Sequence, residues 1–419
     1  MNDMLKTTPD FSLDAAAALL AEHYGLSGTL SPLASERDQN FKVETAEGTF
    51  ILKIVNAAEP QVESDFQTAM LAHLGTHAGD LPVPHIRPTL SGDSLARVTG
   101  SQGLDHRIRL VSWIEGRPLA ETARSDAALN SLGHMLGRFD AALKGFIHPG
   151  ALRDLDWDIR KAGRSAGRLH HIAVAGDRAL LERFLQRFET LGPRLATLRA
   201  AVIHNDANDW NVLVDAQDAD RICGLIDLGD ALHAPVIAEV AIAAAYAGLD
   251  HADPIGAAAE IARGFHAEYP LLEEEINLLY DLIAIRLVTS VTMSASRRSH
   301  TDDNPYLAIS ERPAWELLRK LDRMNPRFAT AILRQACGFE AAPGARAVID
   351  WIDRNRKSLK PLLERPAATY PAALVPYGDP THPMTVLSAA ERPDEAQAIW
   401  EAYARENGVE LGIGPFAEE

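Results

Sequence analysis

The sequence has 419 residues and a formal net charge of −17, with a pI near 5.3. Its basic residues are scattered, so we expect neither nucleic acid nor an anionic membrane as a partner. Two cysteines cannot build a disulfide framework, and neither a signal peptide nor a run of about 18 apolar residues is present. These features predict a soluble, cytoplasmic protein with room for two or three domains or lobes.

The first predicted elements are a helix and a β-hairpin. Ser12 precedes an Ala/Leu-rich run that ends at Tyr24, followed by glycine, which is typical of a capped helix. Two alternating stretches, 40–45 and 49–55, are joined by the short 46–48 link and predict antiparallel strands. One face of this hairpin is expected in the core, through Phe41, Val43, Phe50, Leu52 and Ile54.

Lys53 is expected on the other face of the second strand, among β-branched neighbours. A lysine buried there needs an anionic partner, because its charge alone would be costly to remove from water. The alternative is a solvent-facing lysine at the edge of the sheet. The segment 62–74 has helical apolar spacing with Glu63 in its first turn, where the helix dipole favours a carboxylate even when it is exposed.

The chain changes character near residue 116. A turn at 81–84 leads into further β-structure, and 107–116 is typical of a strand that ends in a glycine turn. From Ser125 onward apolar residues recur at three- and four-residue steps, which indicates helices and places a lobe boundary near residue 116. Further helices are predicted at 236–247, 276–291, 315–324 and 329–337.

The most informative segment is the loop from His204 to Asn211, which lies between two short apolar strands. It places Asp206 and Asn211 five residues apart, and Asp227 follows a further apolar strand, 21 residues after Asp206. Phosphoryl transfer needs such a set: one Asp orients and deprotonates the attacking hydroxyl, while an Asn and a second Asp hold metal ions. The alternatives are a polar hairpin loop and, more weakly, a zinc site without a second His or Cys at metal spacing.

These residues resemble the motifs of the aminoglycoside phosphotransferase and choline kinase superfamily, and most of all its hydroxylysine kinase-like branch. The resemblance extends over roughly residues 10 to 360 and is strongest at 204–230. The protein-kinase motifs H-R-D and D-F-G are replaced by H-N-D and D-L-G-D, which argues against a protein substrate. The resemblance implies an α+β, protein-kinase-like bilobal fold, with a small, mainly β N-lobe at 1–116 and a larger, mainly α C-lobe at 117–364.

The resemblance also implies ATP and Mg²⁺ as cofactors. Asp206 would accept the proton of the substrate hydroxyl, and Asn211 and Asp227 would bind Mg²⁺ through oxygen. His204 would brace the loop by hydrogen bonding. Asp230 would either reach a metal through water or cap the next helix.

On the nucleotide side, Lys53 matches the strand lysine that contacts the phosphates of ATP. The helix carboxylate expected against it is Glu63, with Glu59 as the second choice. The loop at 35–40 has no glycine, so the remaining phosphate contacts stay open. The strand before residue 116 matches the hinge whose backbone pairs with adenine, and its candidate contacts are Val111, Ser112, Trp113 and Ile114.

The expected reaction is phosphorylation of a small amino alcohol or hydroxylated amino acid, such as ethanolamine or hydroxylysine. Other acceptors of the superfamily are aminoglycosides, choline and homoserine. A catalytically silent module that binds nucleotide or substrate is the alternative from another class. Retention of Lys53, Asp206, Asn211 and Asp227 favours the active enzyme.

Prolines recur between residues 365 and 383, so 365–419 is predicted to be a proline-rich linker and tail. Bacterial relatives of this branch are fused ahead of other domains, including a class III aminotransferase-type enzyme. The chain resembles such a leading piece, which implies further domains of the same polypeptide as partners. A monodomain kinase with an ordered tail is the alternative.

Overall fold

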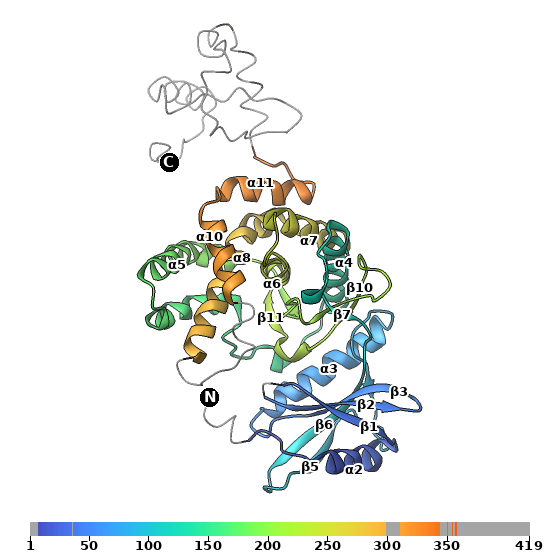
Figure 1. The fold of residues 1–419 in the computed structure, drawn as a ribbon. Coiled ribbons are helices and arrows are strands. Elements are labelled where there is room, and N and C mark those ends of the chain that lie inside the picture. Colours follow the sequence, from blue (N-terminus) through green and yellow to red (C-terminus); the bar gives the residue numbers. More distant parts are fainter. Residues whose placement is uncertain are drawn as a thin grey trace. The chain divides into compact units, whose positions relative to one another are not determined.

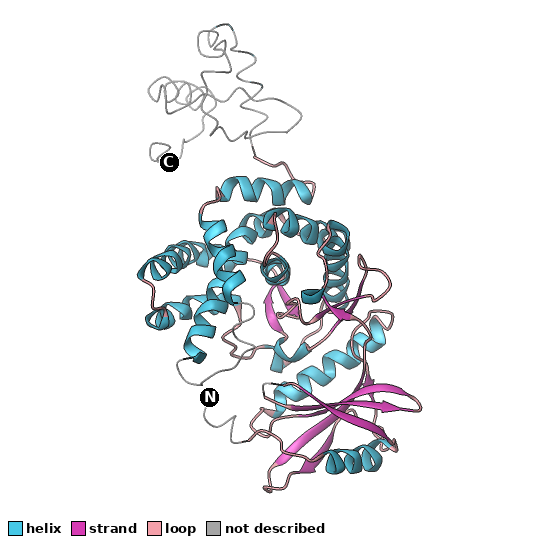
Figure 2. Cartoon of the chain, viewed as in Figure 1, coloured by secondary structure: helices cyan, strands magenta, loops and turns pink. Residues whose placement is uncertain are grey.

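The computed structural model describes residues 7–35, 37–298 and 311–343, together with residues 350, 354 and 357. The chain divides into two compact units, residues 1–324 and 325–419. The first unit contains the N-terminal sheet and most of the helices (Figures 1 and 2). The predicted linker and tail at 365–419 lie outside the described residues.

The N-terminal part is built on an antiparallel sheet. Its strands are β1 (Gly28–Leu33), β2 (Gln39–Thr45), β3 (Gly48–Ile54), β4 (Ile86–Arg87), β5 (Ala96–Thr99) and β6 (Asp105–Ser112). Over the described residues the order is β1-β2-β3-β6-β4, and β5 also pairs with β6. The predicted hairpin is β2–β3, in which Phe41 faces Leu52 and Asn40 faces Lys53.

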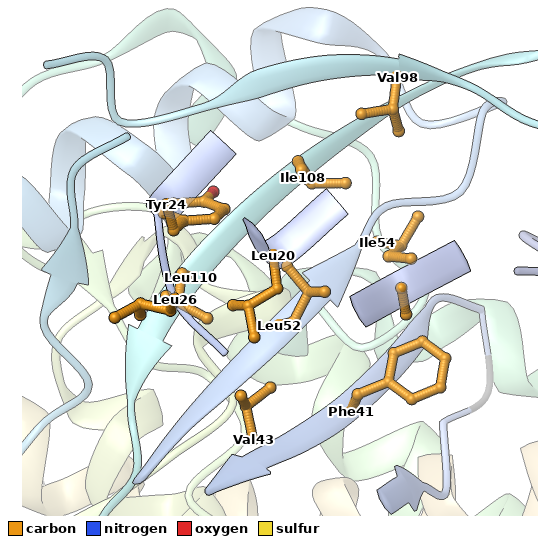
Figure 3. Close-up of a cluster of buried hydrophobic side chains, with 11 residues drawn as sticks. Leu20, Tyr24, Leu26, Phe41, Val43, Leu52, Ile54, Val98, Ile108 and Leu110 are labelled. Atoms are coloured by element: carbon orange, nitrogen blue, oxygen red, sulfur yellow. The ribbon is translucent and has the colours of Figure 1, made fainter. Parts of the chain in front are cut away.

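Helix α2 (Leu13–Tyr24) covers one face of this sheet. Ser12 Oγ accepts the Ala15 N–H at 3.1 Å, and Gly25 ends the helix with a φ of 67°. The apolar side of α2 and the inner face of the sheet form one core cluster (Figure 3), made of Ala16, Leu20, Tyr24, Leu26, Phe41, Val43, Leu52, Ile54, Val98, Ile108 and Leu110. Phe50, also expected in this core, is only partly buried and packs against it.

Helix α3 (Gln61–His77) lies on the opposite side of the sheet from α2 (Figure 1). Arg109 of β6, which is directly opposite Lys53 of β3, donates a hydrogen bond to Gln67 of α3. The face of the sheet that carries Lys53 is therefore the face turned toward α3.

Beyond residue 116 the chain is mainly helical (Figure 2). The helices are α4 (Asp126–Ala142), α5 (Ala175–Leu195), α6 (Ile237–Ala247), α7 (Pro254–Glu268), α8 (Glu273–Arg298), α10 (Glu311–Asp322) and, in the second unit, α11 (Pro326–Ala336). Short 3₁₀ segments are η1 (Leu119–Glu121), η2 (Pro149–Ala151), η3 (Ile159–His171) and η4 (Leu228–Asp230). The α+β fold with a β-rich N-lobe and a helical C-lobe is confirmed.

Two helices of the C-lobe are buried to an unusual degree. Every residue of α6 is buried, as its apolar run predicted. Among the helices of the described ranges, α8 alone is long and apolar enough to cross a membrane, but 78% of its apolar window is buried inside the fold. We therefore interpret α8 as a core helix.

Helices α4 and α7 meet at the level of their backbones. A Cβ added at Gly133 of α4 would lie 2.1 Å from the Ile261 carbonyl oxygen, and one at Gly264 of α7 would lie 2.1 Å from the Asn130 carbonyl oxygen. Any side chain at either position would force the helices apart, so the two glycines permit this close packing.

Two small sheets frame the candidate site. Strand β8 (Ala200–Ile203) pairs with β11 (Leu232–Pro235), and β9 (Val212–Val214) lies between β10 (Ile222–Leu225) and β7 (Arg117–Pro118). The short strands predicted on both sides of the loop at 204–211 are therefore present.

Candidate active site

The loop at 204–211 and the segment around Asp227 lie side by side, because each connects the two small sheets. The Ile226 N–H donates to the Asn211 carbonyl oxygen at 2.9 Å, and His204 Nε2 is 3.0 Å from the Ile226 carbonyl oxygen. Asn205 and Asp227 both adopt left-handed backbone conformations, with φ of 65° and 59°. Asn and Asp are the non-glycine residues that tolerate this conformation best.

His204 is fully buried and makes one hydrogen bond within the loop and one to the segment that precedes Asp227. The Asp206 N–H donates to its Nδ1 at 3.2 Å, so Nε2 carries the proton and donates to the Ile226 carbonyl oxygen. Burial lowers the pKa of His204, which keeps the ring neutral. A neutral ring with both nitrogens occupied braces the loop, in line with the role expected from its place in the motif.

The carboxylate of Asp206 is held at both oxygens. Oδ1 is 3.0 Å from Arg286 Nη2, and Oδ2 accepts hydrogen bonds from Asn208 Nδ2 at 3.0 Å and Asn211 Nδ2 at 2.9 Å. Burial raises the pKa of Asp206 to about 7, and the carboxylates of Asp230 and Asp227 add to the rise while Arg286 opposes it. A carboxylate with a pKa near neutrality suits proton transfer at physiological pH.

Asn211 and Asp227 both present oxygen atoms at this site. Asn211 Nδ2 donates to the carbonyl oxygen and the carboxylate of Asp206, and its Oδ1 takes part in neither bond. Asp227 Oδ1 accepts the Gly229 N–H at 3.2 Å. The carboxylate of Asp230 pairs with Arg37 at 3.0 Å.

Metal binding can be judged from this set of donors. Within the described part of the chain, no group of three or more His, Cys, Asp and Glu side chains gathers to hold an ion. A zinc site therefore lacks a ligand set there. Mg²⁺ prefers oxygen and commonly uses only one or two protein carboxylates together with phosphates and water, so Asn211 and Asp227 fit it.

A pair of buried carboxylates lies beneath the loop. Glu239 Oε2 accepts the Asn205 N–H at 3.1 Å, and Asn205 Nδ2 donates to the Asp230 carbonyl oxygen at 3.1 Å. Asp140 has no exposed surface, and neither of its carboxylate oxygens has a partner among the described residues. Burial, together with the charge of Glu239, raises the pKa of Asp140 well above its ordinary value.

Lys53 forms an ion pair within the N-lobe. Its Nζ is 2.9 Å from Asp38 Oδ2, and the two side chains are 19% and 11% exposed. Asp38 also accepts the Asn56 N–H at 3.0 Å. Although burial opposes it, the neighbouring Lys53 and the Asn56 N–H hold the pKa of Asp38 below its ordinary value. Lys53 thus has the anionic partner that its position requires, and the partner comes from the loop between β1 and β2.

The expected pair between Lys53 and Glu63 does not form. Glu63 Oε2 lies 3.2 Å from Arg153 Nη2 instead, and Glu59 accepts a hydrogen bond from Ser64. The reason is local: Asp38 already neutralises Lys53, and α3 begins at Gln61 with Glu63 directed toward the C-lobe arginine.

The predicted hinge residues occupy the end of β6 and the loop after it. Val111 pairs with Ile51 of β3. The N–H groups of Ser112 and Trp113 donate to the carbonyl oxygens of His85 and Thr49, at 2.8 Å and 3.0 Å. The N–H groups of Ser112 and Trp113 are therefore engaged within the protein and are not free to donate to a base. The fourth predicted contact, Ile114, is the next residue along the chain.

Four charged residues at this site were not predicted from the sequence: Arg37, Asp38, Arg153 and Arg286. Arg286 had a visible signal, because it interrupts the apolar run of a helix whose other residues are largely buried. The other three had none, since their importance depends on contacts between distant segments.

Comparison with known proteins identifies the family of the chain. The model of the phosphotransferase enzyme family matches residues 29–274, more than half of the chain. Hydroxylysine kinase of Mus musculus is 26% identical over 343 residues, which cover 76% of this chain and 91% of that protein. Homoserine kinase of Methylobacillus flagellatus is 27% identical over 225 residues, which cover 54% of this chain and 64% of that protein.

The fold has solved counterparts as well. An amicoumacin kinase in complex with AMP-PNP and Ca²⁺ superposes with a TM-score of 0.59 at 13% identity, covering 78% of this chain and 97% of that one. A microcompartment-associated aminopropanol kinase gives a TM-score of 0.53 at 17% identity, covering 78% and 99%. The chain belongs to the phosphotransferase enzyme family, and it is a small-molecule kinase similar in sequence to the hydroxylysine kinases.

Proposed function

We propose that this chain transfers the γ-phosphoryl group of ATP to a hydroxyl of a small amino alcohol or hydroxylated amino acid. The observation that carries the proposal is the carboxylate of Asp206, which is held by Arg286 at one oxygen and by Asn208 and Asn211 at the other. A carboxylate fixed in this way can orient a hydroxyl and accept its proton.

Positive charge for the nucleotide comes from the face of the sheet turned toward α3. Lys53 and Arg109 are opposite one another on β3 and β6. Arg109 is almost fully buried, and its Nη1 has no partner among the described residues. A polyphosphate bound beside Lys53 would add negative charge next to two cations on neighbouring strands, which supports ATP as the phosphoryl donor.

Mg²⁺ would be held by Asn211 through its amide oxygen and by Asp227 through its carboxylate. Bound there, it would neutralise negative charge on the phosphates during transfer. The oxygen donors of the two residues and the hydrogen bond between Ile226 N–H and the Asn211 carbonyl oxygen support this pairing.

Asp206 orients the acceptor hydroxyl and takes its proton while the hydroxyl oxygen bonds to the γ-phosphorus. The bond from that phosphorus to the bridging oxygen breaks, and ADP leaves with the electron pair. Lys53 counters the negative charge of the phosphates. The proton carried by Asp206 then passes to solvent, since this side chain is 22% exposed.

The acceptor class rests on the chemistry that several relatives have in common. The similar proteins include kinases named for hydroxylysine, homoserine and aminopropanol, and each of these compounds carries a hydroxyl and an amine. The hydroxylysine kinases match over 76% of the chain. The net charge of −17 is compatible with a cationic acceptor.

A screen of hydroxylated amino acids and amino alcohols for acceptor-dependent ADP release tests the proposal, with Asp206→Asn as the inactive reference. We expect release with at least one amine-bearing alcohol and none without acceptor beyond slow hydrolysis. If Mg²⁺-dependent ATP binding is intact and no acceptor in either class promotes ADP release, the chain is a nucleotide-binding module instead.

A further inference from the structure

Arg153 connects the N-lobe helix α3 with the turn that follows Asp227. Its side chain is only 4% exposed. Nη2 lies 3.2 Å from Glu63 Oε2, and Nη1 donates to the Gly229 carbonyl oxygen at 2.8 Å. Its Nε is buried without a partner among the described residues. A buried guanidinium is costly unless it is paired, and its rigid fork can hold two groups at a fixed separation.

Gly229 is the residue through which Arg153 reaches the candidate metal ligand. Its carbonyl oxygen accepts from Arg153, and its N–H donates to Asp227 Oδ1 at 3.2 Å. Asp227 itself has a φ of 59°, a conformation that surrounding contacts must maintain. A shift of Arg153 would therefore move the residue that orients the Asp227 carboxylate.

The contact between Arg153 and α3 is also held in place by close packing. The segment that leads to Arg153 packs closely on the start of α3: a Cβ added at Gly150 would lie 2.2 Å from the Val62 carbonyl oxygen. The rings of Phe66 and His148 are 5.7 Å apart. Glu63 lies on this same turn of α3, so Glu63 and Arg153 are held at fixed positions relative to each other.

We propose that Glu63 and Arg153 are positioning residues that hold the Asp227 turn for its Mg²⁺ ion. The inference rests on the proposed function and deepens it. It gives the carboxylate of α3 a different task from pairing with Lys53, which Asp38 neutralises. Nucleotide binding through Lys53 and metal binding through Asp227 thereby depend on separate ion pairs.

The test is calorimetric titration of ADP with and without Mg²⁺, using the full chain. For Arg153→Met we expect unchanged affinity for metal-free ADP and a Mg²⁺ requirement raised about 10- to 100-fold, the effect typical of residues that orient metal ligands. Arg138→Met is the matched control, because it breaks an exposed ion pair between α4 and Asp80 and touches no part of the turn. It should titrate like the wild type.

Exchanging the charges of Glu63 and Arg153 distinguishes an effect on the Asp227 turn from an effect on overall stability alone. Glu63→Arg combined with Arg153→Glu restores the ion pair, but a glutamate cannot donate to the Gly229 carbonyl oxygen. We expect the exchange to recover Tm without recovering Mg²⁺ affinity. Recovery of both would overturn the inference, and so would a folded Arg153→Met variant with the Mg²⁺ affinity of the wild type.

Glu63→Gln provides a second variant if Arg153→Met does not fold. It keeps the arginine and its bond to Gly229 but removes the counter-charge, so a smaller rise in the Mg²⁺ requirement is expected, and no rise at all would contradict the inference. A wild-type chain that binds ADP no more tightly with Mg²⁺ would refute the proposed function itself, and the inference with it.

Discussion

Arg286 and Asp206 are 80 residues apart in the chain, and their side chains meet at 3.0 Å between Nη2 and Oδ1. The guanidinium lies close to two aromatic rings, 4.5 Å from the centroid of Trp157 and 5.4 Å from that of Tyr246. It also donates to the Trp157 carbonyl oxygen at 3.2 Å. Arg286 is thus immobilised and fixes the orientation of the Asp206 carboxylate.

Arg286→Met should therefore lower kcat by about 10²-fold, a loss typical of a catalytic group displaced by about 1 Å. The affinity for ATP should stay near that of the wild type, because Arg286 pairs with Asp206, whose proposed role is to act on the acceptor hydroxyl. Steady-state kinetics and nucleotide titration measure the two effects. Arg187→Met is the control: it breaks an ion pair to Asp281 on the same helix, away from Asp206, and should leave kcat unchanged. Equal losses in both variants would point to a general effect on α8.

Asp206→Asn keeps the shape of the loop but cannot take a proton. A general base contributes about 10²–10⁴-fold, so kcat should fall by that range while ATP affinity is retained. Lys53→Ala should differ, with weaker ATP binding and slower turnover together. Single-turnover kinetics with calorimetry distinguish the two. Loss of ATP binding in Asp206→Asn, with full turnover at saturation, would mean that Asp206 is a structural or metal-binding group.

Asp38→Asn removes the ion-pair partner of Lys53, which lies directly opposite Arg109. Two cations on neighbouring strands then repel each other, so the Tm of the free protein should fall. ATP would supply the missing negative charge, and the rise in Tm on adding ATP and Mg²⁺ should exceed that of the wild type. Differential scanning calorimetry measures both quantities. An unchanged Tm without nucleotide would show that Asp38 does not neutralise Lys53.

The buried carboxylates Asp140 and Glu239 predict a dependence of stability on pH. Burial raises the pKa of Glu239 from 4.5 to about 7, and that of Asp140 rises as well. In the unfolded chain both groups lose their protons near pH 4, so between about pH 4 and 7 the folded state holds protons that the unfolded state has released. The free energy of unfolding conferred by this pair is therefore highest below pH 4 and falls as the pH rises toward 7.

Asp140→Asn should flatten this decline, because it removes one of the two carboxyls whose pKa burial raises. The measurement is Tm against pH in buffers of constant ionic strength. Asp14→Asn, which changes an exposed carboxylate in α2, serves as the reference and should keep the wild-type slope. If Tm falls with pH as steeply in Asp140→Asn as in the wild type, this pair of carboxyls is not the source of the pH dependence.

Elements that depend on local patterns could be predicted from the sequence alone. Alternating residues and the short 46–48 link specify the β2–β3 hairpin, since side chains alternate between faces along a strand. The spacing of Asp206, Asn211 and Asp227 follows from one loop and one strand, so the motif could be recognised without tertiary information. The buried α6 was predictable from composition alone.

Partners across large sequence separations could not be predicted in this way. Whether a carboxylate on α3 meets Lys53 or Arg153 depends on how the helix packs on the C-lobe, and no periodicity in the sequence encodes that choice. The 3₁₀ segment η3 was missed for a related reason. It is polar, and ion pairs from Asp154 and Asp156 to its arginines and lysine accompany its helical turns.

Helix α7 was also absent from the predictions, although its start carries a local signal. Asp253 caps the helix by accepting the Gly256 N–H at 2.9 Å, and Pro254 occupies the first turn. An Asp-Pro pair before an alanine-rich run is a recognised helix start.

The backbone contact between Gly133 and Gly264 limits how α4 and α7 can move relative to each other. Helices separated by side chains can slide past one another when those side chains change size, but α4 and α7 have no such layer at this contact. Their spacing is set by main-chain atoms, which substitutions elsewhere do not alter. The two helices therefore act as one mechanical unit, and a displacement of either helix at this contact would carry the other with it.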